Sequence, residues 1–142
     1  MTVRPATMQD AARIAALAGQ LGYPSTASEI AGRMRDLAAE GNTAVFVAEG
    51  DGIVTGWIAV GSHLSLESGP FAEIAGLVVD ESHRGGRVGE ALVAAAEAWA
   101  GARGYLRMRV RSNVVRERAH AFYRRLGYGL VKRQAVFDKN LA

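Results

Sequence analysis

Cysteine is absent from this chain of 142 residues. That absence excludes disulfides, thiolate metal sites and a cysteine nucleophile. The chain also has no uninterrupted apolar segment long enough to span a bilayer, and its N-terminus has no signal-peptide pattern. We therefore expect a cytoplasmic protein without a membrane partner.

Two common ligand-binding patterns are also missing. There is no Gly-Lys-Ser/Thr run, so the sequence does not support a P-loop nucleotide hydrolase. The histidines His63, His83 and His120 have no metal-ligand spacing, and we expect them to be surface residues. We therefore predict that the protein binds no metal.

The composition is that of a globular protein. Hydrophobic residues make up 49% of the chain and charged residues 22%, which is ordinary for a folded domain. The net charge of +3 suits an anionic ligand. Aromatic and basic residues are not interleaved, so we expect no nucleic-acid partner. With no repeat and no linker, residues 1–142 are predicted to form one domain.

Hydrophobic spacing and turn residues predict the order of helices and strands. Thr7 and Thr26 are each placed to cap a helix, and Gly41 is placed to end the second one. Gly104 and Gly127 are placed to end two later helices. Gly-Asp-Gly at 50–52 predicts a hairpin turn. Strands are predicted at 3–5, 43–49, 53–60, 71–79, 105–111, 128–131 and 134–139, a loop at 63–70, and later helices at 89–103 and 115–126. This order predicts a mixed α/β fold, in which a mostly antiparallel sheet is flanked by helices.

The most informative part of the chain runs from Phe71 to Glu90. An apolar strand ends at a charged turn, and a basic, glycine-rich loop at 84–89 leads into an alanine-rich helix. Unpaired N–H groups at the start of a helix carry a partial positive charge and suit a phosphate. The glycines let the backbone come close to a ligand, and Arg84 and Arg87 add charge. These residues therefore predict a site for a phosphorylated ligand.

Three features together resemble the GNAT superfamily of acyl-CoA-dependent N-acetyltransferases. They are the segment from Glu73 to Gly89, Asn113, and the run Ala-His-Ala-Phe-Tyr-Arg-Arg-Leu-Gly-Tyr at 119–128. The family's phosphate loop is usually written Gln/Arg-x-x-Gly-x-Gly/Ala. Here the first arginine and the last glycine match, but Arg87 stands where the family has its middle glycine. The similar order of elements covers nearly the whole chain.

The resemblance implies a binding site for acetyl-CoA as cosubstrate, with the central strand pair splayed apart to admit it. The strand end at 77–79 would pair with the pantetheine arm, and the N–H groups at 84–90 would hold the pyrophosphate. Asn113 and the helix that follows would line the other side. The residues implied are Leu77, Val78, Val79, Arg84, Gly85, Gly86, Arg87, Val88, Gly89, Glu90, Asn113, Arg116, Ala119 and Phe122.

The resemblance also implies two catalytic residues. Glu73 matches the base glutamate of the histone-acetyltransferase branch, and a carboxylate on a central strand is partly desolvated. Tyr123 matches the tyrosine that protonates the departing thiolate. Each has a simpler alternative. In the alternative for Glu73, its carboxylate has no catalytic role and pairs with Arg107, Arg109 or Arg111. In the alternative for Tyr123, its side chain is part of the core on the apolar face of its helix.

These observations predict an enzyme that moves an acetyl group from acetyl-CoA to a primary amine by direct attack in a ternary complex. The alternative is a non-catalytic acyl-CoA-binding sensor, and the presence of both Glu73 and Tyr123 argues against it. The expected partner is an amine-bearing acceptor, which the sequence does not identify further. Dimers are common in the family that the chain resembles, so the resemblance also suggests a homodimer.

Overall fold

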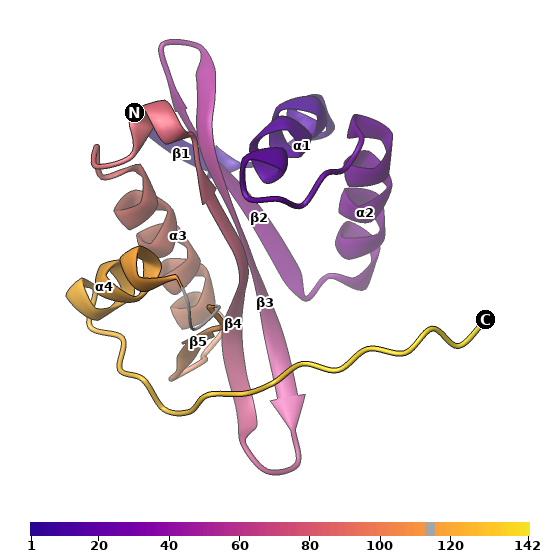
Figure 1. The fold of residues 1–142 in the computed structure, drawn as a ribbon, viewed down its shortest axis with the longest axis vertical. Coiled ribbons are helices and arrows are strands. Elements are labelled where there is room, and N and C mark those ends of the chain that lie inside the picture. The colour runs from indigo at the N-terminus through magenta and orange to yellow at the C-terminus, as the bar shows by residue number, and fades with distance from the viewer. Residues whose placement is uncertain (113–115) are drawn as a thin grey trace. The chain divides into compact units, whose positions relative to one another are not determined.

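The computed structural model describes residues 1–112 and 116–142, so Asn113 lies outside the described residues. The chain divides into two compact units, Met1–Val110 and Arg111–Ala142. The first unit contains the sheet, and the second contains one helix followed by an extended segment (Figure 1).

A five-stranded sheet with the order β1-β2-β3-β4-β5 organises the first unit. The first four strands pair antiparallel, and β5 runs parallel to β4. The strands are β1 (Thr2–Pro5), β2 (Thr43–Gly50), β3 (Ile53–Ser65), β4 (Gly69–Val79) and β5 (Met108–Val110). Helices α1 (Ala11–Gln20) and α2 (Ala27–Glu40) cover one face, and α3 (Val88–Ala102) covers the other (Figure 1). The predicted mixed α/β fold is confirmed.

Local signals in the sequence explain where several elements begin and end. The Glu29 N–H donates to the Thr26 hydroxyl at 3.1 Å, and the Thr26 N–H donates to the Glu29 carboxylate at 2.9 Å, which makes a capping box at the start of α2. Gly41 ends that helix with a φ of 75°. Asp51 and Gly52 have φ values of 53° and 74°, as a type I′ turn between two strands requires. These predicted caps and this turn are confirmed.

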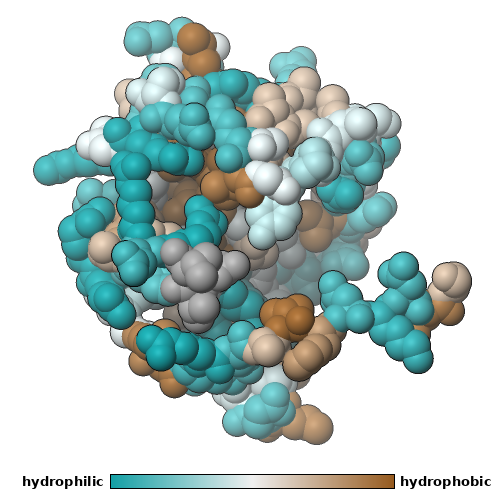
Figure 2. All heavy atoms as spheres, viewed as in Figure 1, coloured by the Kyte–Doolittle hydropathy of each residue, from teal (hydrophilic) through white to brown (hydrophobic). Residues whose placement is uncertain are grey.

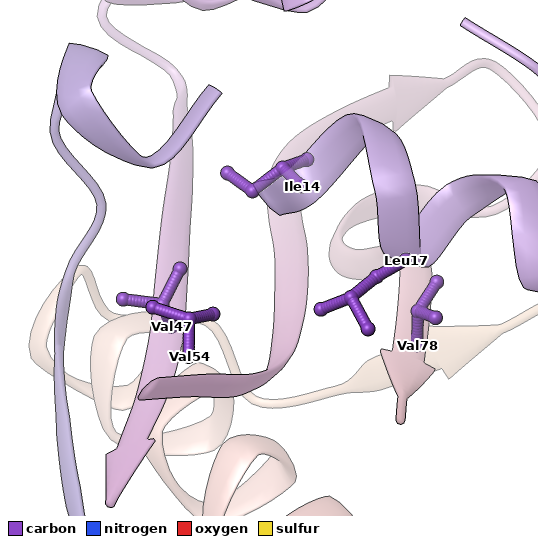
Figure 3. Close-up of a cluster of buried hydrophobic side chains, with 5 residues drawn as sticks. All are labelled: Ile14, Leu17, Val47, Val54 and Val78. Atoms are coloured by element: carbon purple, nitrogen blue, oxygen red, sulfur yellow. The ribbon is translucent and has the colours of Figure 1, made fainter. Parts of the chain in front are cut away.

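A cluster of buried side chains holds α1 against the sheet. Ile14 and Leu17 from the helix pack on Val47, Val54 and Val78 from β2, β3 and β4 (Figure 3). The most exposed of the five, Val54, has only 8% of its surface accessible. Burying a side chain of this size contributes roughly 1.5–3 kcal/mol. Val78 therefore fixes the C-terminal end of β4 from the α1 side.

Strand β4 is irregular on both of its edges. Its register with β3 skips Ala75, which forms a β-bulge. On its other edge β4 pairs with β5 only from Ala72 to Ile74. Beyond Ile74, within the described part of the sheet, no strand pairs with this edge. Strand β4 therefore has an unpaired edge beyond Ile74, in the region where the resemblance implied a splay between the two strands.

The segment 63–70 is not the loop that the sequence predicts. β3 continues to Ser65 and β4 starts at Gly69, so the residues at 66–68 alone close the hairpin. The rings of His63 and Phe71 meet across the two strands, with centroids 4.8 Å apart. Serine, glycine and proline suggested a longer loop, but cross-strand contacts of this kind stabilise the extended ladder.

Strand β5 is shorter than the predicted strand at 105–111. The Tyr105 N–H donates to the Ala100 carbonyl at 3.0 Å and closes the end of α3, behind Gly104 with its φ of 85°. The Tyr105 N–H is therefore hydrogen-bonded at the end of α3 and does not take part in the sheet.

The predicted strands at 128–131 and 134–139 are wrong. Among residues 116–142 the second unit has α4 (Glu117–Arg125) and no strand. Gly127 ends this helix as expected, with a φ of 94°, and the Tyr128 N–H donates to the Tyr123 carbonyl at 3.0 Å. A strand needs a hydrogen-bonded neighbour, and the described residues of this unit offer none. Alternating apolar residues alone therefore do not make a strand here.

The face shown in Figure 2 is mainly hydrophilic, with hydrophobic residues scattered in small groups. In the second unit the exposed large apolar side chains lie after α4, and they include Leu130, Val131, Val136 and Phe137. In the described residues, no helix combines the length and the apolar character needed to cross a membrane.

Asp10 ties β1 to the start of α1. Its carboxylate accepts hydrogen bonds from the Arg4 guanidinium at 2.9 and 3.0 Å and from the Thr7 N–H at 2.8 Å, and the residue is 7% exposed. The hydrogen bonds from Arg4 lower the pKa of Asp10, against the opposing effect of burial. Asp10 therefore keeps its charge in the folded protein at a pH where an unfolded chain takes up a proton.

The stabilisation by Asp10 is complete above the unfolded pKa of 3.8 and is lost as the pH falls through the lower folded value. Asp10→Asn is expected to lower the free energy of unfolding by about 2 kcal/mol at pH 7, with a smaller loss at pH 3. Urea denaturation at both pH values measures this. Asp36→Asn, at an exposed position on α2, is the control. Equal losses at both pH values would contradict the prediction.

Candidate active site

The predicted anion site begins where β4 ends. A short 3-10 turn, η2 (Glu81–His83), is followed by the loop 84–87 and then by α3. The loop residues are exposed, whereas Val88 is buried against the sheet. The N–H groups of Val88, Gly89 and Glu90 belong to the first turn of α3 and have no acceptor within the helix. This arrangement gives an accessible, electropositive helix end that suits a phosphate.

Two residues with left-handed backbone shape this loop. Gly85 has a φ of 86°, and Arg87 has a φ of 66° and a ψ of 10°. A glycine adopts this conformation without steric cost, so Arg87 takes the backbone shape expected of the family's middle glycine. Its side chain does not cap the helix. The loop therefore combines the geometry of a glycine with the charge of an arginine.

Asp80 anchors the loop to α1. Its carboxylate accepts hydrogen bonds from Arg13 at 2.7 Å and from Gln20 at 3.3 Å, and the His83 ring lies 3.7 Å away. Burial raises the pKa of Asp80, but the hydrogen bonds from Arg13 and Gln20 outweigh it and the net shift is downward. Arg13 also neutralises the charge of Asp80, which would otherwise repel an anion in the loop.

The predicted pantetheine strand is the last part of β4. Leu77, Val78 and Val79 pair with β3 on one side, while the opposite edge has no strand beside it in the described part of the sheet. Backbone groups at such an open edge are available to an extended ligand. The side chain of Val78 is buried in the α1 cluster, which holds this part of β4 in place.

A pocket of about 230 Å³ lies on the face of the sheet that α1 and α2 cover. Its lining comes from α2 and three strands and consists of Leu37, Thr43, Ala59, Gly61, Ser62, His63, Glu73 and Ala75. Most of these side chains are small, and Glu73 supplies the acidic group. The Glu73 side chain is 17% exposed. The bulge at Ala75 therefore lies beside a largely buried carboxylate at the wall of a pocket.

His63 lies beside this carboxylate rather than on an unrelated surface. The distance between His63 Nδ1 and Glu73 Oε2 is 3.9 Å, and the His63 side chain is 46% exposed. Sequence reasoning missed this residue because it predicted a loop at 63–70. A strand continuing to Ser65 would have placed His63 and Glu73 on the same face of adjacent strands.

The arginines expected to pair with Glu73 make other contacts. Arg107 and Arg109 place their guanidinium groups over the Phe71 ring, 5.1 and 4.3 Å from its centroid. Arg109 is also the neighbour of Glu73 in the parallel register of β4 and β5. Arg111 donates a hydrogen bond to Gln134 at 2.7 Å within the second unit. Arg107 and Arg109 thus contact the Phe71 ring, and Arg111 contacts the Gln134 side chain.

Tyr123 lies on α4 in the second unit. Its ring packs edge-on against Phe122 and Tyr128, with centroids 5.1 and 5.9 Å away. Burial raises the pKa of the Tyr123 hydroxyl, and the charge of Arg116 partly opposes this. The hydroxyl therefore carries its proton at neutral pH, although a higher pKa makes it a weaker acid. The same ring packing is also expected if Tyr123 is only a core residue without a catalytic role.

The predicted site residues fall into three groups. The first unit holds the strand end 77–79, the loop 84–90 and Glu73, all on one continuous strand–loop–helix segment. The second unit holds Arg116, which precedes α4, together with Ala119, Phe122 and Tyr123 on that helix. Asn113 lies outside the described residues.

The left-handed backbone of Arg87 leads to a test of stability. Arg87→Gly is expected to unfold at a higher urea concentration than Arg87→Ala, by about 1 kcal/mol in the free energy of unfolding, because only glycine relieves the strain. Both variants lose the guanidinium, so their difference isolates the backbone. Equal stability of the two variants would show that the residue at 87 is not left-handed in solution.

The GNAT acetyltransferase family model matches residues 12–128 of the chain. A search of curated protein sequences found no significant match. Among solved structures, the aminoglycoside antibiotic 6'-N-acetyltransferase AAC(6')-IG from Acinetobacter haemolyticus has a TM-score of 0.85 at 20% identity, with 100% of both chains covered. The aminoglycoside N-acetyltransferase AAC(6')-Iy, solved in complex with CoA, has a TM-score of 0.87 at 19% identity, covering 97% of this chain and 93% of that one.

A structure described as a transcriptional regulator from Bacillus halodurans also matches, with a TM-score of 0.85 at 22% identity over 97% of this chain and 99% of that one. At such identities the structural matches show a shared fold and do not select an acceptor. The family model covers most of the sequence and both units. The chain therefore belongs to the GNAT family of acetyltransferases.

Proposed function

We propose that the protein is an acetyl-CoA-dependent N-acetyltransferase in which Glu73 is the general base. The observation that carries this proposal is a largely buried carboxylate in a pocket, on the same strand that leads into the anion loop. A base on this strand and a phosphate site at its end are the two parts that the reaction needs. The family membership supports the same reaction class.

The loop and the open strand edge are the proposed binding site for acetyl-CoA, which supplies the acetyl group as a thioester. The N–H groups at 84–90 would hold its pyrophosphate, with Arg84 and Arg87 adding charge. The free edge at 77–79 would pair with its extended arm. This proposal treats residues 1–142 as one acetyltransferase domain and assigns acetyl-CoA binding to Ala119 and Phe122 on α4 from the family resemblance alone.

The proposed reaction assigns one proton transfer to each catalytic residue. Glu73 takes a proton from the ammonium group of the acceptor and passes it to water. The neutral amine then forms a C–N bond to the thioester carbonyl as the C–S bond breaks, with a backbone N–H of Leu77 or Val79 holding the oxyanion. The nitrogen releases its second proton to solvent, the Tyr123 hydroxyl gives its proton to the departing sulfur, and the tyrosinate takes a proton back from solvent. Amide, free thiol and one released proton balance the reaction.

The pocket favours a narrow amine acceptor. Its walls are mainly small residues, and its acidic group attracts a cation. A primary amine at the end of an unbranched aliphatic arm matches this lining. Bulky or branched groups next to the amine would meet α2 at Leu37.

The catalytic assignments are tested by Glu73→Gln and Tyr123→Phe. At saturating substrates each is expected to lower turnover by about 10²-fold or more, because general acid and base groups contribute that much. Release of free CoA across a panel of amines measures turnover, and the thermal shift with acetyl-CoA checks that binding is retained.

A wild-type turnover in Glu73→Gln would eliminate the base role, and the same result in Tyr123→Phe would leave the tyrosine as core packing. Binding of acetyl-CoA without turnover on any amine would favour the alternative of an acyl-CoA sensor. Stabilisation by ATP or oligonucleotides but not by acetyl-CoA would reject the proposal entirely.

The acceptor pocket is tested separately by Ala59→Leu, which fills space at its wall. We expect kcat/KM for the amine to fall by about tenfold, as a lost or blocked pocket contact of 1–3 kcal/mol implies, with the KM for acetyl-CoA unchanged. Ala94→Leu, at an exposed position of α3 on the opposite face, is the control. A parallel rise in the KM for acetyl-CoA would show that the pocket does not belong to the acceptor.

A further inference from the structure

A second titratable side chain shares the pocket with the proposed base. His63 and Glu73 both line it, and His63 Nδ1 lies 3.9 Å from Glu73 Oε2. The imidazole is the more accessible of the two, with 46% of the side chain exposed against 17% for the carboxylate. The histidine therefore sits where it can act on Glu73 without itself being buried.

The hairpin fixes this pair in place. His63 is opposite Phe71 and Gly61 is opposite Glu73, so the two side chains are diagonal neighbours on one face of the sheet. The His63 ring packs against Phe71 at 4.8 Å with an interplanar angle of 38°, and Phe71 is 1% exposed. The buried phenyl ring is therefore a fixed support for the imidazole. Gly61 has no side chain to come between the histidine and the glutamate.

The charged groups around this pair are distributed over two elements. Arg107 donates to the Ser68 carbonyl at 3.0 Å and also lies over Phe71, on which Arg109 lies as well. Arg109 is the register neighbour of Glu73 on β5. Arg107 and Arg109 do not line the pocket, whereas His63 does. It is therefore the one best placed to influence how the carboxylate meets an acceptor.

We infer that His63 is a positioning residue for Glu73, an inference that rests on the proposed function. A glutamate side chain has several rotamers, and its carboxylate must point at the amine nitrogen for proton transfer. A distance of 3.9 Å is too long for a direct hydrogen bond. The imidazole acts instead through the polarity of its ring and by occupying space, which hold the carboxylate toward the pocket. A displacement of about 1 Å at a reacting group can cost 10²-fold in rate.

Two substitutions of His63 test separately the contribution of its aromatic ring and that of its Nδ1 atom. His63→Phe keeps the stacking on Phe71 and removes Nδ1, whereas His63→Asn keeps a polar nitrogen near the same place and removes the ring. We expect His63→Phe to lower kcat by about tenfold, within the range for coupled neighbours, and His63→Asn to stay within about threefold of wild type. Acetyl-CoA binding and thermal stability are expected to be unchanged in His63→Phe. Leu64→Gln, 76% exposed on the next position of β3, is the control for the hairpin.

The decisive measurement is a double-mutant cycle with Glu73→Gln. If His63 acts through Glu73, adding His63→Phe to Glu73→Gln is expected to lower kcat no further. A tenfold loss in both backgrounds would overturn the inference, since His63 would then act independently of the base. Wild-type kcat in His63→Phe would overturn it as well, with the base role of Glu73 intact. Wild-type turnover in Glu73→Gln alone would instead reject the proposed function.

Discussion

The unequal hydrogen bonding of β4 is the constraint on which the rest of the structure depends. Toward β3 the strand is paired along its length, apart from the bulge. Toward β5 it is paired only from Ala72 to Ile74. Pairing on one side keeps the strand ordered, and the missing pairing on the other side leaves backbone groups for a ligand. One strand can therefore hold Glu73 at its paired middle and offer an open edge close to the anion loop.

Features set by neighbouring residues in the chain were predicted well from the sequence. The capping box at Thr26, the glycine ends of three helices and the type I′ turn each depend on a few adjacent residues, and all are found. The strand–loop–helix order around residues 84–87 belongs to the same class, whereas anion binding by this loop stays a prediction. The sequence pattern was sufficient because the partners in each case lie within a few positions.

Features set by distant pairing were predicted poorly. The ladder at 63–70 is held by cross-strand contacts such as that between His63 and Phe71, which turn residues do not reveal. The segments at 128–131 and 134–139 have strand-like composition, but the described residues of their unit contain no strand for them to pair with. His63 was overlooked for the same reason, because its relation to Glu73 exists only once the register of the hairpin is known. The roles of Glu73 and Tyr123 came from the family resemblance and stay predictions.

The bulge at Ala75 also decides which residues of β4 share a face. Glu73 and Val78 are five positions apart, and in a regular strand residues at an odd separation point to opposite faces. Here Glu73 lines the pocket beneath α2, while Val78 packs under α1 on that same face. The extra residue shifts the alternation by one position and makes this possible. A single inserted residue therefore lets one strand direct the proposed base, Glu73, and the hydrophobic anchor, Val78, to the same side. Deleting this residue would turn one of the two side chains to the opposite face of the sheet.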